Sequence, residues 1–207
     1  MATGRVIIKW VIVVSLAIVL FILYKGCIQR ATFDADRIAA AETAMWKAYY
    51  SANKRALALE LISLQRHQFG LTITEASQVA WDMANAAEKF IAAKENYGPI
   101  VLPDLESAYT RIKRISGLDF DPKEVAQAEL DWWVARRTLG NNAPEQVGAK
   151  IAHLYALLYG EEKPGFEKAG LLRAQAAHLR DLGGVNADWK KVEDILRVSY
   201  SELAQCI

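Results

Sequence analysis

The feature that most constrains this chain is an apolar run near its N-terminus, residues 6–24, which contains one charged residue and no Gly or Pro. An α-helix needs about 20 consecutive apolar residues to cross a bilayer. The single charge, Lys9, lies near the start of the run, where its long side chain can extend to the lipid headgroups. The run therefore predicts a single transmembrane anchor over residues 1–26, to which we assign Val6, Lys9, Trp10 and Tyr24.

Two other N-terminal signals compete with an uncleaved anchor. A cleaved secretory signal needs small residues before its cleavage site, whereas bulky Tyr24 and charged Lys25 end the apolar run here. The pair Gly26-Cys27 resembles the end of a bacterial lipobox, which makes lipidation of Cys27 an alternative. The two residues before that pair depart from the lipobox pattern. An uncleaved single span fits these residues better than either alternative.

The orientation of the anchor is weakly marked, because Lys and Arg residues are nearly balanced between its two ends. A short basic tail ahead of a first apolar segment is typical of a signal-anchor, which translocates the chain that follows. We therefore expect the domain after the anchor on the extracytoplasmic or periplasmic side of the membrane. The two cysteines, Cys27 and Cys206, leave a disulfide between them open, and they show no zinc-ligand spacing.

Residues 27–207 are numerous enough for one domain with a hydrophobic core. Arg5 and Lys9 are the charged residues of the first 24, so the rest of the chain carries 23 basic and 24 acidic residues. This near-neutral balance argues against nucleic-acid binding, which favours a basic domain. Abundant Ala, Leu, Glu, Lys and Arg, with no alternating β-branched run after the anchor, favour an all-α fold.

Gly, Pro and capping residues divide this domain into about seven predicted helices, arranged as a bundle or an α-solenoid. The longest predicted helix covers residues 34–69 and is nearly continuous with the anchor, as a stalk. Asp34 or Asp36 caps its start, and Gly70 ends it. The capping box Thr72-Ile73-Thr74-Glu75 starts the next helix, which extends to about residue 96. Later helix starts are predicted near Pro103, Pro122, Pro144, Pro164 and Asn186.

Polar and aromatic residues fall beside apolar helix faces when the chain is turned by about 100° per residue. Buried polar groups need partners, so we expect glutamates to meet arginines from facing helices beneath Trp and Tyr rings. This candidate binding network consists of Glu42, Trp46, Tyr49, Asn53, Glu60, His67, Glu129, Trp132, Trp133, Arg136 and Arg173, with Arg180 as a further partner. The same residues also suit structural ion pairs that fix helix register.

No catalytic or metal-binding motif accompanies this network. A di-iron carboxylate bundle requires Glu-x-x-His pairs, but none of the three histidines follows a Glu by three residues. A looser site of Glu60, His67 and His178 is the remaining metal alternative. Phosphate-binding loops, the serine-hydrolase elbow and the HExxH motif are absent from the sequence. We therefore predict neither a cofactor nor a metal.

The anchor and the absence of catalytic motifs favour a non-catalytic accessory or scaffold subunit that docks on a larger membrane protein complex. The alternative is a membrane-tethered helical binding protein that holds a lipid or a small acidic ligand in a pocket lined by Trp, Tyr and Glu/Arg pairs. An enzyme that uses the same polar residues is a third hypothesis. The expected partners are the membrane and a protein complex, without nucleic acid.

Overall fold

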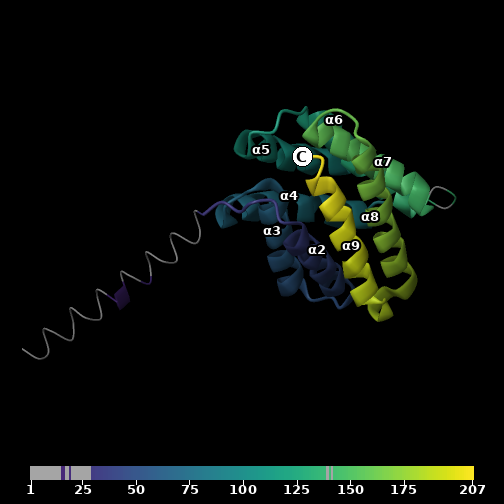
Figure 1. Ribbon diagram of the computed structural model, residues 1–207, viewed down its shortest axis with the longest axis horizontal. Helices are drawn as coiled ribbons and strands as arrows, with labels where there is room; N and C mark the ends of the chain where they lie inside the picture. The colour runs from purple at the N-terminus through teal and green to yellow at the C-terminus, as the bar shows by residue number, and fades with distance from the viewer. Residues whose placement is uncertain (1–14, 17–18, 20–28, 139, 141) are drawn as a thin grey trace, which may run out of the picture.

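The computed structural model describes residues 15, 16, 19, 29–138, 140 and 142–207 (Figure 1). These residues include eight α-helices and one short 3-10 helix, and they contain no β-strand. The predicted all-α fold is therefore confirmed for the part of the chain that the structure describes. The predicted anchor lies almost entirely outside it, together with Val6, Lys9, Trp10, Tyr24 and Cys27. No helix within the described residues is long and apolar enough to span a bilayer.

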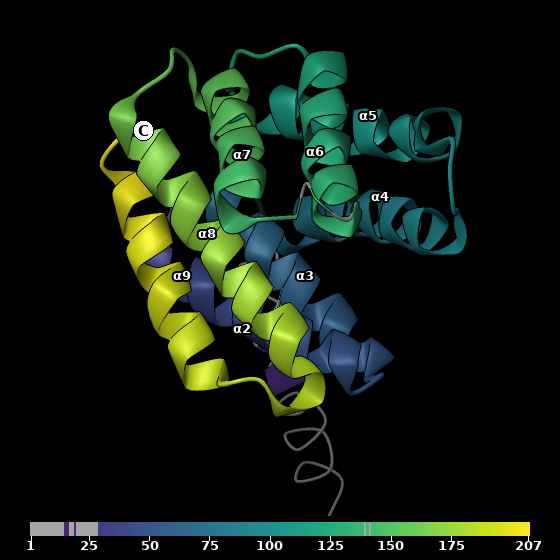
Figure 2. The ribbon, with the colours of Figure 1, turned by 90° about the vertical axis from the view of Figure 1, so that its right-hand side faces the viewer.

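The helices follow one another through short connections. They are α2 (Ala35–Tyr50), α3 (Lys54–Phe69), α4 (Ile73–Ala92), α5 (Tyr97–Ser116), α6 (Pro122–Arg137), α7 (Pro144–Tyr159), α8 (Pro164–Gly183), the 3-10 helix η1 (Gly184–Asn186) and α9 (Trp189–Ala204). Sequential helices pack on one another, and α9 returns to pack along α2 (Figures 1 and 2). This contact between α2 and α9 closes the described helices into a bundle, whereas an α-solenoid would leave its ends apart.

The predicted single helix over residues 34–69 is wrong, because the chain breaks into α2 and α3 just after Tyr50. Ala52 adopts the left-handed backbone conformation, with φ of 54°. The side chain of Asn53 then accepts a hydrogen bond from the amide of Ala56 at 3.1 Å and caps α3. Neither Gly nor Pro marks this break, so the ordinary stop signals of a helix are missing from the sequence there.

The segment that leads into α2, residues 29–34, is not helical and is fixed against the domain. Arg30 pairs with Glu75 at 3.2 Å and donates a hydrogen bond to a carbonyl at the end of α5 at 3.3 Å. The amide of Ala31 donates to the carbonyl of Leu71 at 3.4 Å. A stalk helix continuous with the anchor is therefore wrong over these residues, which instead form a linker held at the α3–α4 turn.

Most of the other predicted helix starts are confirmed. Asp34 caps α2, and Asp121 caps α6 just before the proline that begins that helix. The capping box at Thr72 forms with both of its hydrogen bonds, at the start of α4. Pro144 and Pro164 are the first residues of α7 and α8. These signals act within one helical turn, which is why the sequence alone reveals them.

Two predicted boundaries differ from the structure. The helix α5 begins at Tyr97, so Pro103 lies inside it. Val101 and Leu105 are fully buried on either side of that proline, and this packing outweighs the one backbone hydrogen bond that Pro103 removes. The last helix is capped by Asp188, whose side chain accepts a hydrogen bond from the amide of Lys191 at 3.0 Å, while the predicted cap belongs to η1.

Two hydrophobic cores lie side by side in the bundle. One is built chiefly from α2, α7, α8 and α9, and includes Ile38, Phe166 and Leu196. The other is built chiefly from α4, α5 and α6, with further residues from α7. Trp132 and Tyr159 pack against both cores. Two buried polar clusters, around Glu42 and Glu129, adjoin each other near the ring of Trp132.

Candidate functional site

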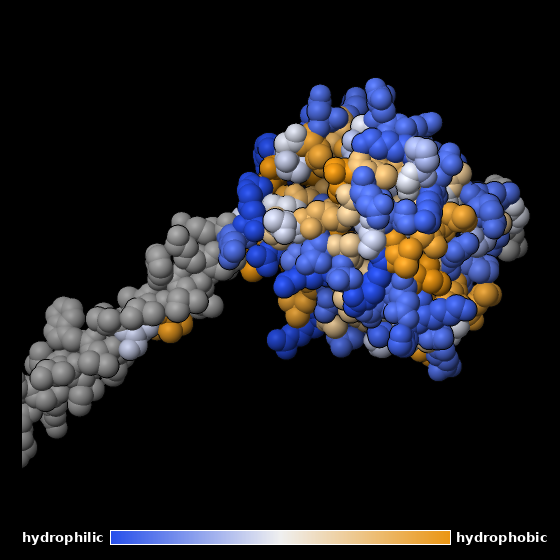
Figure 3. Space-filling view, viewed as in Figure 1, coloured by the Kyte–Doolittle hydropathy of each residue, from blue (hydrophilic) through white to orange (hydrophobic). Residues whose placement is uncertain are grey.

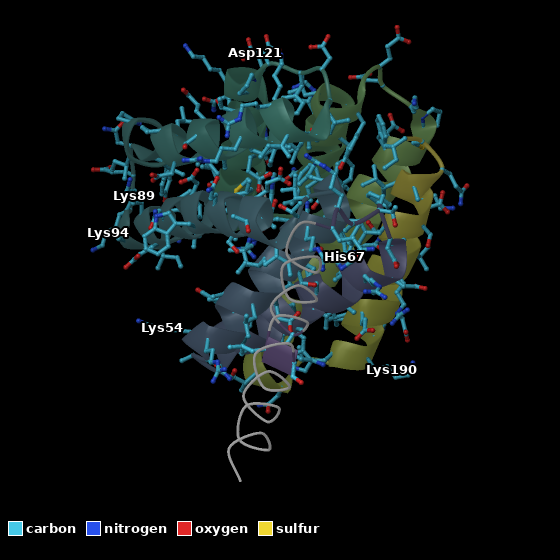
Figure 4. All side chains as sticks on the ribbon, turned by 90° about the vertical axis from the view of Figure 1, so that its left-hand side faces the viewer. Lys54, His67, Lys89, Lys94, Asp121 and Lys190 are labelled. Atoms are coloured by element: carbon cyan, nitrogen blue, oxygen red, sulfur yellow. The ribbon has the colours of Figure 1, made fainter. Side chains whose placement is uncertain are left out.

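The polar residues predicted to share one face of a long helix are separated by the break between α2 and α3. Glu42 is buried, whereas Tyr49 is 50% exposed on the surface. Asn53 is exposed, and its side chain serves as the cap of α3. Glu60 is half-buried and forms no ion pair within the described part of the chain. His67 is half-buried on α3, close to the N-terminal linker (Figure 4).

Glu42 is the centre of a buried cluster formed by α2, α8 and α9. Its Oε1 accepts hydrogen bonds from Arg173 Nη2 at 2.7 Å and from Arg173 Nε at 3.1 Å. Its Oε2 accepts a hydrogen bond from the hydroxyl of Tyr200 at 2.7 Å. Burial is the largest single influence on Arg173 and opposes its charge, but Glu42 together with Tyr200 and Tyr155 outweighs burial and holds the pKa of Arg173 well above its ordinary value. The protein interior therefore supplies partners for this carboxylate on both of its oxygens.

Trp132 and Tyr155 enclose the guanidinium of Arg173. The Cζ atom of Arg173 lies 5.3 Å from the centroid of the Trp132 ring, within the range of a cation–π interaction. Tyr155 is fully buried, and burial raises the pKa of its hydroxyl to about 12. The indole Nε1 of Trp132 is buried without a hydrogen-bond acceptor among the described residues. An unsatisfied buried donor of this kind costs ~1–3 kcal/mol.

Glu129 forms a second cluster between α5 and α6. Its Oε2 accepts a hydrogen bond from the hydroxyl of Tyr109 at 2.9 Å, and its Oε1 accepts one from Trp133 Nε1 at 2.8 Å. Burial and the charge of Glu129 together raise the pKa of Tyr109 well above its ordinary value. The charge of Arg173 also acts on Tyr109, so the two clusters are neighbours. The sequence led us to expect an arginine beside Glu129, whereas the structure places two neutral donors on it.

Asp181, which was not among the residues of the predicted binding network, is the carboxylate that meets the other two arginines. Arg136 Nη1 lies 3.5 Å from Asp181 Oδ2, and Arg180 Nε donates to Asp181 Oδ1 at 2.9 Å. The hydroxyl of Tyr50 donates to the same oxygen at 2.9 Å. Arg180 also lies over the ring of Trp46, at 4.1 Å from its centroid. This cluster joins the ends of α2 and α8 to α6, a meeting that spacing along one helix does not reveal.

These clusters form a polar band in which Glu42, Glu129 and Arg180 are buried, whereas Asp181 is exposed at one end. Their donors and acceptors are mostly engaged with one another, which suits a role in fixing how the helices meet. Among the described residues, no group of three or more His, Cys, Asp or Glu side chains is placed to hold a metal ion. The looser site of Glu60, His67 and His178 is therefore not assembled.

A partly exposed group of aromatic and aliphatic side chains lies where the end of α2 meets the connection between α8 and α9. We name it the aromatic patch and define it by Tyr49, Tyr50, Leu182, Val185 and Trp189. The rings of Tyr50 and Trp189 are 6.2 Å apart, and those of Tyr49 and Tyr50 are 5.3 Å apart. Leu182 and Val185 are 74% and 60% exposed. The signal in the sequence was a pair of large apolar residues on either side of a Gly-Gly turn.

Figure 4 labels two lysines toward one end of the bundle, Lys54 at the first position of α3 and Lys190 at the second position of α9, while Lys89 and Lys94 of the α4 region lie away from that end. Figure 3 shows charged and polar side chains interspersed with apolar areas over one face of the domain.

Two adjoining grooves, of about 380 and 220 Å³, lie along α6 and α7. Asp131 and Lys150 line both of them. No residue of the predicted binding network lines either groove, so neither is the interior pocket that the sequence suggested. No protein-family model, curated protein or solved structure matches this chain. The function proposed for it therefore rests on the geometry of its own side chains.

Proposed function

We propose that this chain is a membrane-anchored, non-catalytic accessory or scaffold subunit that docks on a larger membrane protein complex through the aromatic patch. The observation that carries the proposal is a group of side chains at the α8–α9 connection: the half-buried rings of Tyr50 and Trp189 contact each other, Val185 is exposed beside Trp189, and Leu182 is exposed in the same connection. Groups of exposed apolar side chains mark interaction sites on folded proteins. Trp and Tyr are also enriched among the residues that contribute most to binding.

The polar band supports a non-catalytic role. A catalytic acid or base must reach the substrate, whereas Glu42 and Tyr200 are buried and bound to each other. Arg173 is held between Glu42 and the ring of Trp132. The residues with the most perturbed environments are thus committed to contacts within the protein, which is typical of structural networks.

The position of the patch also suits a tethered docking subunit. The N-terminal linker enters the domain just before α2, and the patch includes the last residues of that helix. A helix of 16 residues is about 24 Å long. The tether and the patch are therefore at opposite ends of α2, so a partner on the patch does not compete with the linker for the same surface.

The test is the size of the assembly after mild detergent extraction, for the natural chain and for Leu182→Glu. We expect the natural chain in a larger assembly and Leu182→Glu as a free subunit, because a charge in an apolar contact is costly. Ile91→Glu is the matched control, since Ile91 is 52% exposed on α4, a helix that contributes no residue to the patch. A natural chain that elutes alone, or a Leu182→Glu variant that stays assembled, would overturn the proposal.

A second candidate function is the tethered binding protein, and the buried indole of Trp132 favours it. This donor has no acceptor among the described residues and lies beside the guanidinium of Arg173. A small acidic molecule could accept from both groups. Native mass spectrometry of the extracted protein tests this: the natural chain should retain added mass that Trp132→Phe loses. A natural chain at its bare mass under the same gentle conditions would rule the candidate out.

A further inference from the structure

The N-terminal linker holds one end of the bundle close to the point where the predicted anchor ends, and we infer that this end rests on phospholipid headgroups. We name it the linker face and define it by Arg30, Arg66, Ile73, Thr74 and Arg114, which lie on the linker, at the α3–α4 turn and at the end of α5. The inference rests on the membrane anchor of the proposed function and specifies which surface of the domain meets the lipid.

The chain between the predicted anchor and the linker is short. The apolar run ends at Tyr24, and the linker begins at Gln29, five Cα–Cα steps further on. A fully extended chain covers at most ~18 Å in five steps. A headgroup layer is itself ~5–8 Å thick. An anchored chain therefore keeps Gln29 within roughly 13 Å of the headgroup surface.

The linker is fixed to the bundle at this end. Nη2 of Arg66 donates a hydrogen bond to the carbonyl of Gln29 at 3.2 Å. Nη1 of Arg30 donates to the carbonyls of Gly70 and Ile115, at 3.4 and 3.3 Å. Figure 1 shows the linker beside α3 and α4, on the side of the bundle away from the start of α7. Because these contacts tie Gln29 to the α3–α4 turn and to the end of α5, those segments come as close to the lipid as the linker does.

Positive charge is in excess around the linker. The ion pairs there are Arg30–Glu75, Arg37–Asp34, Arg197–Asp36 and Lys113–Asp119. Arg114 is exposed, Arg66 is half-buried, and neither forms an ion pair within the described residues. Arginine binds phosphate oxygens through two parallel hydrogen bonds. A cation near an anionic leaflet gains ~1 kcal/mol, so phospholipid phosphates are fitting partners for these two arginines.

The short tether also favours lipid over a protein partner on this face. A folded domain of about 100 residues has a radius of gyration of ~13 Å, so it does not fit into the gap that the tether leaves. Ile73 is 37% exposed in the first turn of α4, next to exposed Thr74. A single apolar side chain among cations and a hydroxyl suits the headgroup layer, where apolar and charged groups are mixed.

The experiment measures fluorescence quenching by lipids that carry a nitroxide on the headgroup. The full chain with Cys27→Ser and Cys206→Ser is reconstituted into vesicles of phosphatidylcholine and phosphatidylglycerol, with one fluorophore on Thr74→Cys or on Glu145→Cys. Both sites are exposed, and Glu145 lies at the start of α7. We expect quenching at residue 74 to be at least threefold stronger than at residue 145. Equal quenching at the two sites, or none at residue 74, would overturn the inference.

A charge reversal tests the role of the arginines. Arg114→Glu should lower the quenching at Thr74→Cys at least twofold, because it places an anion against the lipid phosphates. Arg55→Glu is the matched control, since Arg55 is exposed at the other end of α3, and it should leave the quenching unchanged. Unchanged quenching in Arg114→Glu would overturn the assignment of this face to lipid phosphates.

Flotation of the same vesicles tests the anchor separately. A chain that floats with the vesicles but shows equal quenching at both sites would leave the anchor standing and overturn the linker face. A chain that stays behind in the gradient would overturn the anchor of the proposed function, and the linker face with it. The docking role of the aromatic patch is decided by the Leu182→Glu sizing experiment, which uses neither label.

Discussion

Arg173 is surrounded by three side chains in the described bundle. It donates hydrogen bonds to Glu42, lies over the ring of Trp132 and is close to the hydroxyl of Tyr155. We expect Arg173→Met to lower the free energy of unfolding by ~3–5 kcal/mol, because it leaves a buried carboxylate without its cation. Tyr200→Phe removes one hydrogen bond to a charged group and should cost less, ~1.5–3 kcal/mol. Denaturant unfolding followed by circular dichroism measures both.

The double variant Glu42→Leu/Arg173→Met is the control for this prediction. It removes both charges together, so it should recover most of the loss of Arg173→Met. Lys190→Met provides the surface reference, because the Lys190–Asp194 pair is exposed. If Arg173→Met is as mild as Lys190→Met, the buried pair does not determine the stability of the bundle.

The buried tyrosines predict how the fold responds to alkali. Burial is the largest cause of the raised pKa values of Tyr109, Tyr155, Tyr159 and Tyr200. The pKa of a tyrosine in the unfolded chain is about 10, and these four pKa values are higher in the fold. The protonated hydroxyls therefore stabilise the fold in full below about pH 10, and this stabilisation is lost as the pH rises from there through the folded-state pKa values. We expect these four to form phenolates only as the helices unfold, which absorbance and circular dichroism recorded together would show. Ionisation of all eight tyrosines with the helical signal intact would contradict this.

At the scale of the elements, the turn between α2 and α3 carries a strained residue. Ala52 has a positive φ, a conformation that costs an L-residue ~1–2 kcal/mol and that Gly adopts freely. We expect Ala52→Gly to raise the free energy of unfolding by ~1 kcal/mol, once the greater freedom of Gly in the unfolded chain is included. Ala58→Gly, at an exposed site within α3, should instead lower it by ~1 kcal/mol. Equal losses in the two variants would show that the turn is not strained.

The sequence predicted most helix starts because caps are local. Thr72 and Asp121 bind amides two or three residues away, and no distant contact is needed to recognise them. The break at Ala52 escaped prediction because alanine is the best helix former, so nothing in its identity indicates the left-handed backbone that it adopts before the Asn53 cap. At Pro103 the error was the opposite one: the sequence predicted a helix start, whereas the structure has the interior of α5 there. Buried neighbours of Pro103 keep α5 helical through the proline.

The candidate site was less predictable than the helices. The helical repeat indicated that Glu42 and Arg173 face inward, but their meeting joins residues 131 positions apart. Trp133 lies one turn from its partner Glu129, a contact within reach of sequence reasoning, whereas Tyr109 reaches that glutamate from another helix. The aromatic patch depends on the α8–α9 connection lying against α2, which no local pattern specifies.

At the scale of the whole molecule, the contacts of the N-terminal linker (residues 29–34) indicate where the independently folding unit begins. Removal of residues 1–28 should leave the unfolding midpoint unchanged, because the Arg30 and Ala31 contacts remain. Removal of residues 1–34 takes away those contacts and the Asp34 cap, worth ~1 kcal/mol on its own, and should lower the midpoint. Thermal unfolding of both truncated chains measures this. Identical midpoints would mean that the linker contributes nothing to the fold.

The attachment of the linker also has a mechanical consequence. A pull on the N-terminus meets Arg30 and Ala31 first, and their bonds lead to the α3–α4 turn and to the end of α5. The load is therefore shared among several helices before it reaches the first turn of α2. In a tethered subunit, such an attachment transmits force to the whole bundle. A force between the tether and a docked partner would therefore move the domain as one unit before it unwinds α2.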